Sequence, residues 1–158
     1  MNIGHSAVNA RIAICILSMV MPWILIIFSG TKLTSLSEYF YTPLGPFFIC
    51  VLSLVSYLLF TLPKWIPSAI LLFIVLMFPN RDYPLIHNSA AILFFISAAL
   101  AILFDKKHVW MGWMMILFSP IVLFDLFVVE FIMIMIISSY HLTILSNIKK
   151  ILKRRDKI

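Results

Sequence analysis

Nine polar, ionisable or tyrosine residues near the ends of apolar runs are the best candidates for chemistry in this sequence. Ionisable residues close to membrane depth often mark binding sites or ion paths. We call this set the outer polar cluster; its members are Glu38, Tyr39, Tyr41, Arg81, Asp82, His87, Asn88, Asp125 and Glu130.

The members of the outer polar cluster suggest several roles. Arg81 could pair with Glu38 or Asp125, and His87 could act as an acid, a base or a ligand. The alternative is structural: charges at helix ends cap, anchor and form salt bridges of small energetic value. Glu130 is expected to be the most buried member, because a long apolar stretch follows it.

Established catalytic and metal-binding motifs do not occur in the sequence. His5, His87, His108 and His141 lack H-x-x-x-H or H-E-x-x-H spacing. There is also no G-x-S-x-G, P-loop or G-x-G-x-x-G segment. We therefore expect no catalytic residues, no metal site and no cofactor, and a protein that is not an enzyme.

The elements that position these residues are apolar runs of membrane-spanning character. Of the 158 residues, 63% are hydrophobic and 11% charged, unlike a soluble domain. The runs are continuous rather than alternating, which favours helices over barrel strands. The sequence predicts an all-α, polytopic transmembrane bundle forming a single domain over 1–158, with spans at about 12–30, 44–62, 65–79, 89–104, 109–124 and 127–145.

Two parts of this assignment leave alternatives open. The third span is short for a membrane crossing, so it is tilted into a thinned bilayer or re-entrant. The stretch 109–145 either divides into two helices near Asp125 or forms one long kinked helix. The second alternative would give five spans instead of six.

The distribution of positive charge favours six spans with both termini in the cytoplasm. Cytoplasmic loops of membrane proteins carry the excess of Lys and Arg. With six spans, ten Lys and Arg lie inside, against Lys32 and Arg81 outside. With five spans and a cytoplasmic tail, the separation falls to eight Lys and Arg inside against four outside.

A basic tail at 146–158 follows the last span. Its positive residues are Lys149, Lys150, Lys153, Arg154, Arg155 and Lys157. They fit a topology signal that attracts anionic lipid headgroups. The alternative is a short amphipathic helix that docks a cytoplasmic protein partner, and nucleic-acid binding is disfavoured because no aromatic residues are interleaved.

Two segments carry a resemblance to a known family. Residues 35–42, SLSEYFYT, resemble an S-I-S-E-Y-Y-Y-T signature, and Phe78-Pro79 with 87–95 resembles an F-P…H-x-x-S-A-A-x-x-F-F pattern. This signature belongs to small six-helix membrane proteins similar to the post-GPI-attachment and damage-regulated autophagy modulator group. The resemblance implies a six-helix fold, both segments on the non-cytoplasmic side, and Glu38, Tyr39, Tyr41 and His87 as positions to test.

The functional expectation is a non-enzymatic subunit of the bacterial cytoplasmic membrane. Such a subunit would oligomerise and anchor or signal to a cytoplasmic partner. This expectation rests on analogy with compact membrane components of bacterial defence and stress systems. The first alternative is a lipid-binding or lipid-remodelling protein that uses the outer polar cluster. The second is an oligomeric pore, for which Asp125 and Glu130 would have to supply most of the polar lining.

Overall fold

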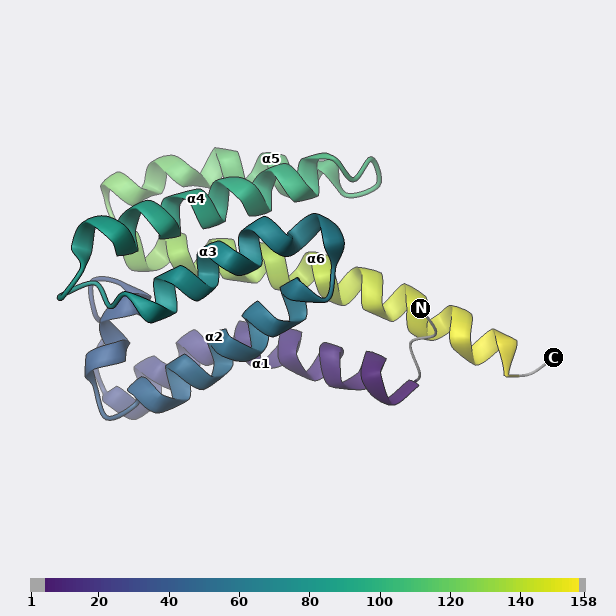
Figure 1. The fold of residues 1–158 in the computed structure, drawn as a ribbon, viewed down its shortest axis with the longest axis horizontal. Helices are drawn as coiled ribbons and strands as arrows, with labels where there is room; N and C mark the ends of the chain where they lie inside the picture. Colours follow the sequence, from purple (N-terminus) through teal and green to yellow (C-terminus); the bar gives the residue numbers. More distant parts are fainter. Residues whose placement is uncertain (1–4, 157–158) are drawn as a thin grey trace.

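The chain folds into a bundle of helices, as the computed structural model shows for residues 5–156 (Figure 1). Six α-helices and three short 3-10 helices make up this part of the chain, which holds no β-strand. Their bounds are α1 His5–Ser29, η1 Leu36–Tyr41, α2 Gly45–Phe60, η2 Pro63–Trp65, α3 Ile66–Met77, α4 Pro84–Leu103, α5 Val109–Phe118, η3 Ser119–Leu123 and α6 Leu126–Arg155.

Helices that follow one another in sequence pack side by side, and α6 closes the bundle. Contacts join α1 to α2, α2 to α3, α3 to α4, and α4 to α5. The last helix, α6, lies along α1 and also contacts α4 and α5. In Figure 1 the first and last helices extend beyond the others at the same end of the bundle. That end holds the turns α2–α3 and α4–α5, whereas η1 lies at the opposite end.

Proline and glycine set several of the helix boundaries. Pro46, Pro67 and Pro84 occupy the first or second position of α2, α3 and α4, where the missing N–H breaks no helical hydrogen bond. Gly30 ends α1 with a φ of 70°, a conformation that glycine adopts without strain. At Gly45 a Cβ atom would lie 2.2 Å from the Phe40 carbonyl oxygen, so this glycine lets η1 pack directly on α2.

Three helices are long and apolar enough to cross a membrane: α1, α4 and α6. The α6 helix has 30 residues, a length of about 45 Å, whereas a bilayer core is about 30 Å thick. The segments Gly45–Phe60, Pro63–Met77 and Val109–Leu123 are apolar but shorter.

The helices depart from the predicted spans at four places. The α1 helix begins at His5, ahead of the predicted start at about 12. The α4 helix begins at Pro84, ahead of the predicted start at 89, because Pro84 initiates it. At Ser119 the α5 helix changes into the 3-10 helix η3, because Pro120 offers no N–H for an α-helical bond. The α6 helix continues through most of the predicted tail to Arg155, and Lys157 lies outside the described residues.

The helical conformation is interrupted at Asp125, the point where the sequence suggests a division into two helices. Asp125 is extended, with φ −156° and ψ 98°, and caps α6. Its Oδ1 accepts a hydrogen bond from the Val128 backbone N–H at 3.1 Å. This bond satisfies one of the free donors at the start of the helix.

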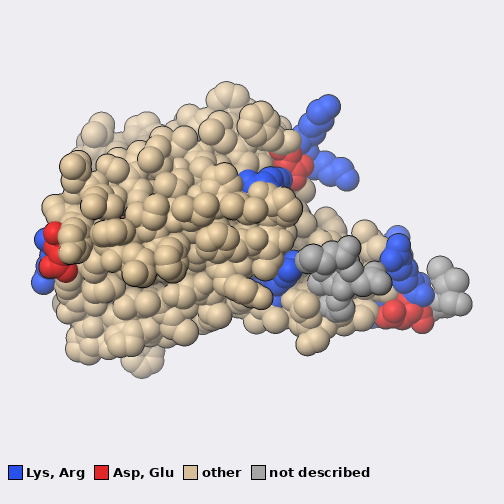
Figure 2. Space-filling model, in the orientation of Figure 1, with Lys and Arg blue, Asp and Glu red and all other residues tan. Residues whose placement is uncertain are grey.

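Charged residues and exposed apolar side chains occupy different parts of the bundle. In Figure 2 charged residues gather at the two ends, and the sides between them are formed by other residues. Large apolar side chains lie exposed along the helices; Phe73 on α3, Ile92 on α4 and Trp113 on α5 are 51%, 60% and 61% exposed. Apolar surface on this scale is expected of a protein that faces lipid.

Candidate functional site

The 3-10 helix η1 and residues 31–35 before it form one end of the bundle. The Glu38 side chain accepts a hydrogen bond from the Thr34 N–H at 3.2 Å. Tyr39 is fully buried, whereas Glu130, expected to be the most buried member of the outer polar cluster, is half-buried. The Tyr39 hydroxyl donates to the Thr31 carbonyl at 2.7 Å. The Phe127 N–H donates to the Thr34 carbonyl at 3.1 Å, which ties this segment to the start of α6.

The Asp125 carboxylate pairs with Lys32, and not with Arg81. The hydrogen bond from Lys32 and that from the Val128 N–H lower the pKa of Asp125 from its ordinary value. This pair joins the end of α1 to the start of α6. The ion pair therefore connects these two helices at the end of the bundle where η1 lies.

Other members of the outer polar cluster lie around the turn between α3 and α4. The Tyr41 hydroxyl accepts the Arg81 backbone N–H at 2.7 Å, and the Arg81 guanidinium lies 4.4 Å from the centre of the Tyr41 ring. Asp82 and Asn88 are exposed. These contacts fix the turn against η1.

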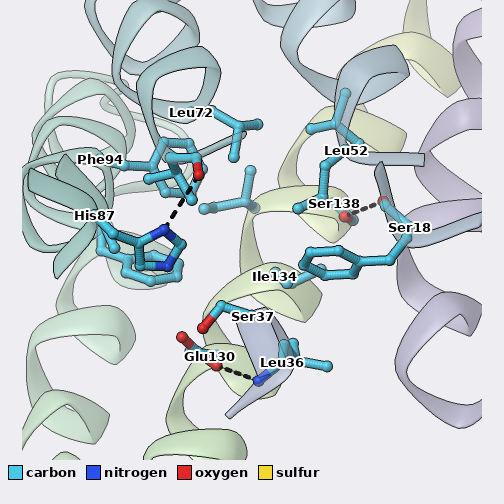
Figure 3. A pocket seen from close by; sticks show the side chains of 16 residues that line it. Ser18, Leu36, Ser37, Leu52, Leu72, His87, Phe94, Glu130, Ile134 and Ser138 are labelled. Carbon is cyan, nitrogen blue, oxygen red and sulfur yellow. Dashed lines mark hydrogen bonds between the residues drawn. The ribbon is translucent and has the colours of Figure 1, made fainter. Parts of the chain in front are cut away.

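Glu130 and His87 differ from the rest of the outer polar cluster because both reach into the bundle. The Glu130 Oε2 atom accepts a hydrogen bond from the Leu36 backbone N–H at 2.6 Å. His87 is 5% exposed, and its Nδ1 lies 2.9 Å from the Phe78 carbonyl oxygen and 3.2 Å from that of Val75. Both side chains line one cavity (Figure 3).

This cavity has a volume of about 60 Å³ and lies at the centre of the bundle. Helices α1, α2, α3, α4 and α6 and the 3-10 helix η1 all contribute to its wall. We call it the central cavity; its lining residues are Ser18, Leu36, Ser37, Phe48, Leu52, Val55, Leu72, Val75, His87, Ala91, Phe94, Phe95, Glu130, Ile134, Ile137 and Ser138. The volume suffices for a few water molecules or a small organic group.

Polar groups occupy two places in the otherwise apolar wall. Glu130, Ser37 and His87 lie nearer the end where η1 is found, and Ser18 and Ser138 form a second polar pair further along α6 (Figure 3). The Ser18 and Ser138 hydroxyl oxygens are 2.7 Å apart, and Ser18 also donates to the Cys15 carbonyl at 2.9 Å. Between the two places the wall is aliphatic and aromatic.

A second polar network, absent from our sequence-based candidates, lies at the opposite end of the bundle. The Lys64 ammonium donates to the Tyr140 hydroxyl at 2.6 Å, and this hydroxyl donates to the Asp105 carboxylate at 2.9 Å. His108 Nδ1 lies 3.1 Å from the same carboxylate oxygen. The network thus joins the α2–α3 turn, the α4–α5 turn and α6.

Hydrogen bonds determine the charge state at the centre of this network. Desolvation raises the pKa of Asp105, but hydrogen bonds from His108, the Lys107 N–H and Tyr140 outweigh it and hold the pKa below its ordinary value. Asp105 is therefore an anion that joins the α4–α5 turn to Tyr140 on α6. His141 follows Tyr140 on α6, and its ring lies 4.4 Å from the Trp65 ring, centre to centre. Its buried Nε2 has no hydrogen-bond partner within residues 5–156.

The described basic residues of the predicted tail are exposed on the last turns of α6: Lys149, Lys150, Lys153, Arg154 and Arg155. Asp156 follows them and lies 2.7 Å from His5 Nε2, which connects the end of α6 to the start of α1. The predicted tail residue Lys157 is outside the described part of the chain. The five described residues form a positively charged extension of α6.

Sequence reasoning identified Glu130 and His87 but missed the serines and the aromatic wall between them. Ser138 stands eight residues after Glu130, about two helical turns, so both lie on one face of α6. That spacing could have linked them. Ser18 and Ser37 carry no comparable signal, because only the packing of α1 and η1 against α6 brings them to the central cavity.

Comparison with known protein families, curated proteins and solved structures finds no match to this chain. The resemblance carried by residues 35–104 therefore stays a prediction. The geometry of the chain itself, with its central cavity and two charged ends, is the basis for any functional assignment.

Proposed function

We propose that this chain is an integral protein of the bacterial cytoplasmic membrane, with six helical segments crossing the bilayer and both ends in the cytoplasm. Three long apolar helices and three shorter apolar segments support this number. Lys64 in the α2–α3 turn and Lys106 and Lys107 in the α4–α5 turn lie at the same end of the bundle as the positive extension of α6. Lys and Arg side chains are visible at this end in Figure 2. This end would face the cytoplasm, because positive residues are retained there.

Within that membrane protein, we propose that the central cavity binds a small amphiphile. The observation that carries the proposal is the lining: a largely apolar wall with Glu130, His87 and Ser37 gathered toward one end. Ligand sites typically combine an apolar wall with a few polar groups that fix the orientation of the ligand. The polar group of the amphiphile would contact Glu130 and His87, and its apolar part would pack on Phe48 and Phe94.

The position of Glu130 supports a binding role over a purely structural one. A carboxylate at membrane depth is costly and is retained where it has a partner or a function. Its one hydrogen bond within residues 5–156, from the Leu36 N–H, engages only Oε2. An amide in place of the carboxylate would accept the same bond, so fixing η1 alone does not require a charge at this position.

Filling the central cavity tests the proposed function. The Ala91→Leu variant places three additional carbon atoms at the wall of the cavity, whereas Ser89→Leu, on the same helix, places a leucine at an exposed position as the matched control. Small molecules retained by the chain after purification in lipid nanodiscs are extracted and quantified by mass spectrometry. We expect a bound amphiphile that is depleted in A91L and kept in S89L; equal retention in both variants would contradict the proposal.

The extension of α6 supports a second candidate function, the docking of a cytoplasmic protein. Five exposed positive residues lie on the same helix that lines the central cavity through Glu130 and Ser138. A protein partner bound there would contact a rigid element of the ligand site. This arrangement fits a small subunit that oligomerises in the membrane and signals to a partner.

Replacing all five basic residues with Gln tests this docking. The matched control is the double variant K106Q/K107Q, which removes positive charge from the same end of the bundle but leaves α6 intact. In native mass spectrometry of complexes isolated in mild detergent, the Gln-substituted helix should lose a stoichiometric soluble protein that the control keeps. Retention of that protein by both variants would exclude α6 as the docking element.

A further inference from the structure

The hydrogen-bonding groups in the central cavity are nearly all acceptors. Glu130 uses Oε2 for the Leu36 N–H, and no bond to its Oε1 is present in the described part of the chain. Figure 3 shows the Glu130 carboxylate and His87 on the same side of the cavity. A carboxylate is an acceptor only, so Oε1 remains available to a donor.

The contacts of His87 determine which of its ring nitrogens can accept a hydrogen bond. Nδ1 lies within 3.2 Å of two carbonyl oxygens, those of Phe78 and Val75. Since carbonyl oxygens can only accept, Nδ1 carries the proton. In the neutral ring Nε2 then holds the lone pair and is an acceptor.

The serine pair further along α6 has no hydroxyl proton to offer a ligand. Ser18 donates its proton to the Cys15 carbonyl, so the contact between the two hydroxyls requires Ser138 to donate to Ser18. Both protons are used within the protein. Ser37 shares a hydrogen bond of 2.9 Å with Ser35, which leaves at most one free donor in that pair.

The charge of the cavity wall has one sign. Glu130 is the only acidic residue among the 16 that line the cavity, and none of them is Lys or Arg. An unpaired carboxylate in an apolar environment is unfavourable, and a cation beside it would offset that cost. Phe48, Phe94 and Phe95 add aromatic surface, which also favours a cation.

We propose that the ligand of the central cavity is a small primary amine in its ammonium form, carrying a short apolar chain. Its three N–H groups match the available acceptors on Glu130, His87 and Ser37, and its chain occupies the apolar part of the wall. This inference rests on the proposed function, since it assigns the ligand class of the same site. A carboxylate of equal length would be repelled by Glu130, and an alcohol would offer one donor and no charge.

The inference is tested with three ligands of equal chain length: n-butylamine, n-butanol and n-butyrate. The full-length chain in nanodiscs, in phosphate buffer free of other amines, is heated with each ligand at the same concentration and ionic strength. A ligand that binds only the folded state raises the unfolding midpoint by an amount that grows with the logarithm of its affinity. We expect the largest rise with n-butylamine, an at least tenfold weaker apparent affinity for it in E130Q, and an unchanged affinity in E38Q.

The controls separate this inference from the proposed function. Glu38 lies at the same end of the bundle as Glu130 but does not line the cavity, so E38Q changes the charge without changing the site. If n-butanol or n-butyrate binds as well as n-butylamine and A91L abolishes that binding, the cavity is a binding site but the amine assignment is wrong. If none of the three ligands raises the midpoint, both proposals fail. The comparison of the three ligands on the unmodified chain and on A91L decides these outcomes even if E130Q does not fold.

Discussion

Replacing Tyr140 with Phe is predicted to destabilise the bundle by removing one hydroxyl group at a fully buried position. Tyr140 is 0% exposed, and its hydroxyl links Lys64 to Asp105 through bonds of 2.6 and 2.9 Å. The ring would remain in place, because Trp65 and His108 pack on it at centroid distances of 5.6 and 5.4 Å. The substitution therefore isolates the polar connection from the packing.

The size of this effect follows from the two bonds that are lost. Hydrogen bonds to charged partners contribute about 1.5–3 kcal/mol each in soluble proteins, whereas bonds between membrane helices average about 0.6 kcal/mol. Lys64 is exposed and can recover hydration, and Asp105 keeps its bonds to His108 and the Lys107 N–H. We therefore expect Y140F to lower the free energy of unfolding by about 2 kcal/mol.

The assay is reversible unfolding in mixed micelles, with circular dichroism reporting helix loss. Tyr57→Phe is the matched control, because the Tyr57 side chain is 67% exposed on the side of α2. It should change the free energy of unfolding by less than about 0.5 kcal/mol. Equal stability of Y140F and Y57F would refute the conclusion that the network at this end holds the turns to α6.

Three further predictions address other parts of the fold. The Gly45→Ala variant should lose about 1–3 kcal/mol in the same unfolding assay, because its Cβ would collide with the Phe40 carbonyl; unchanged stability would contradict the close packing of η1. Because the pKa of Asp105 is lowered, the stabilisation by its carboxylate is present at neutral pH and is lost in acid. Unfolding titrations from pH 7 to 3 should show a shallower decline in the free energy of unfolding for D105N than for the unmodified chain. Parallel curves for the two proteins would argue against this. Ser138→Ala should cost about 0.6 kcal/mol through the bond to Ser18, measured by the same unfolding; a cost above about 2 kcal/mol would indicate a larger network than the structure shows.

The helical fold is predictable from the sequence because apolar runs of this length cannot remain in water. The break at Asp125 also carries a local signal, a short polar side chain directly before an apolar run. The length of α6 is not predictable from hydropathy. The helix continues through Lys149 to Arg155, where positive side chains are favourable because they lie near the negative end of the helix dipole.

The candidate site is predictable only in part. Glu130 and His87 stand out because a charged or polar side chain interrupts apolar sequence. Ser18 and Ser37 do not, because their role depends on which helices pack together, and that is a property of the tertiary structure. Tyr140 stands within an apolar stretch of the sequence, and its bond to Asp105 depends on a turn 35 residues earlier in the chain.

The measurement that tests the central claim most directly is the location of a bound small molecule by NMR. The chain is labelled at its Leu and Ile methyl groups in nanodiscs and mixed with n-butylamine and, separately, with n-butanol. Binding in the central cavity predicts intermolecular NOEs from at least one of these molecules to the methyl groups of Leu52, Leu72 and Ile134, and their loss in A91L. NOEs confined to exposed methyl groups such as those of Leu85, which is 80% exposed, would show that the ligand stays in the lipid and would contradict the account.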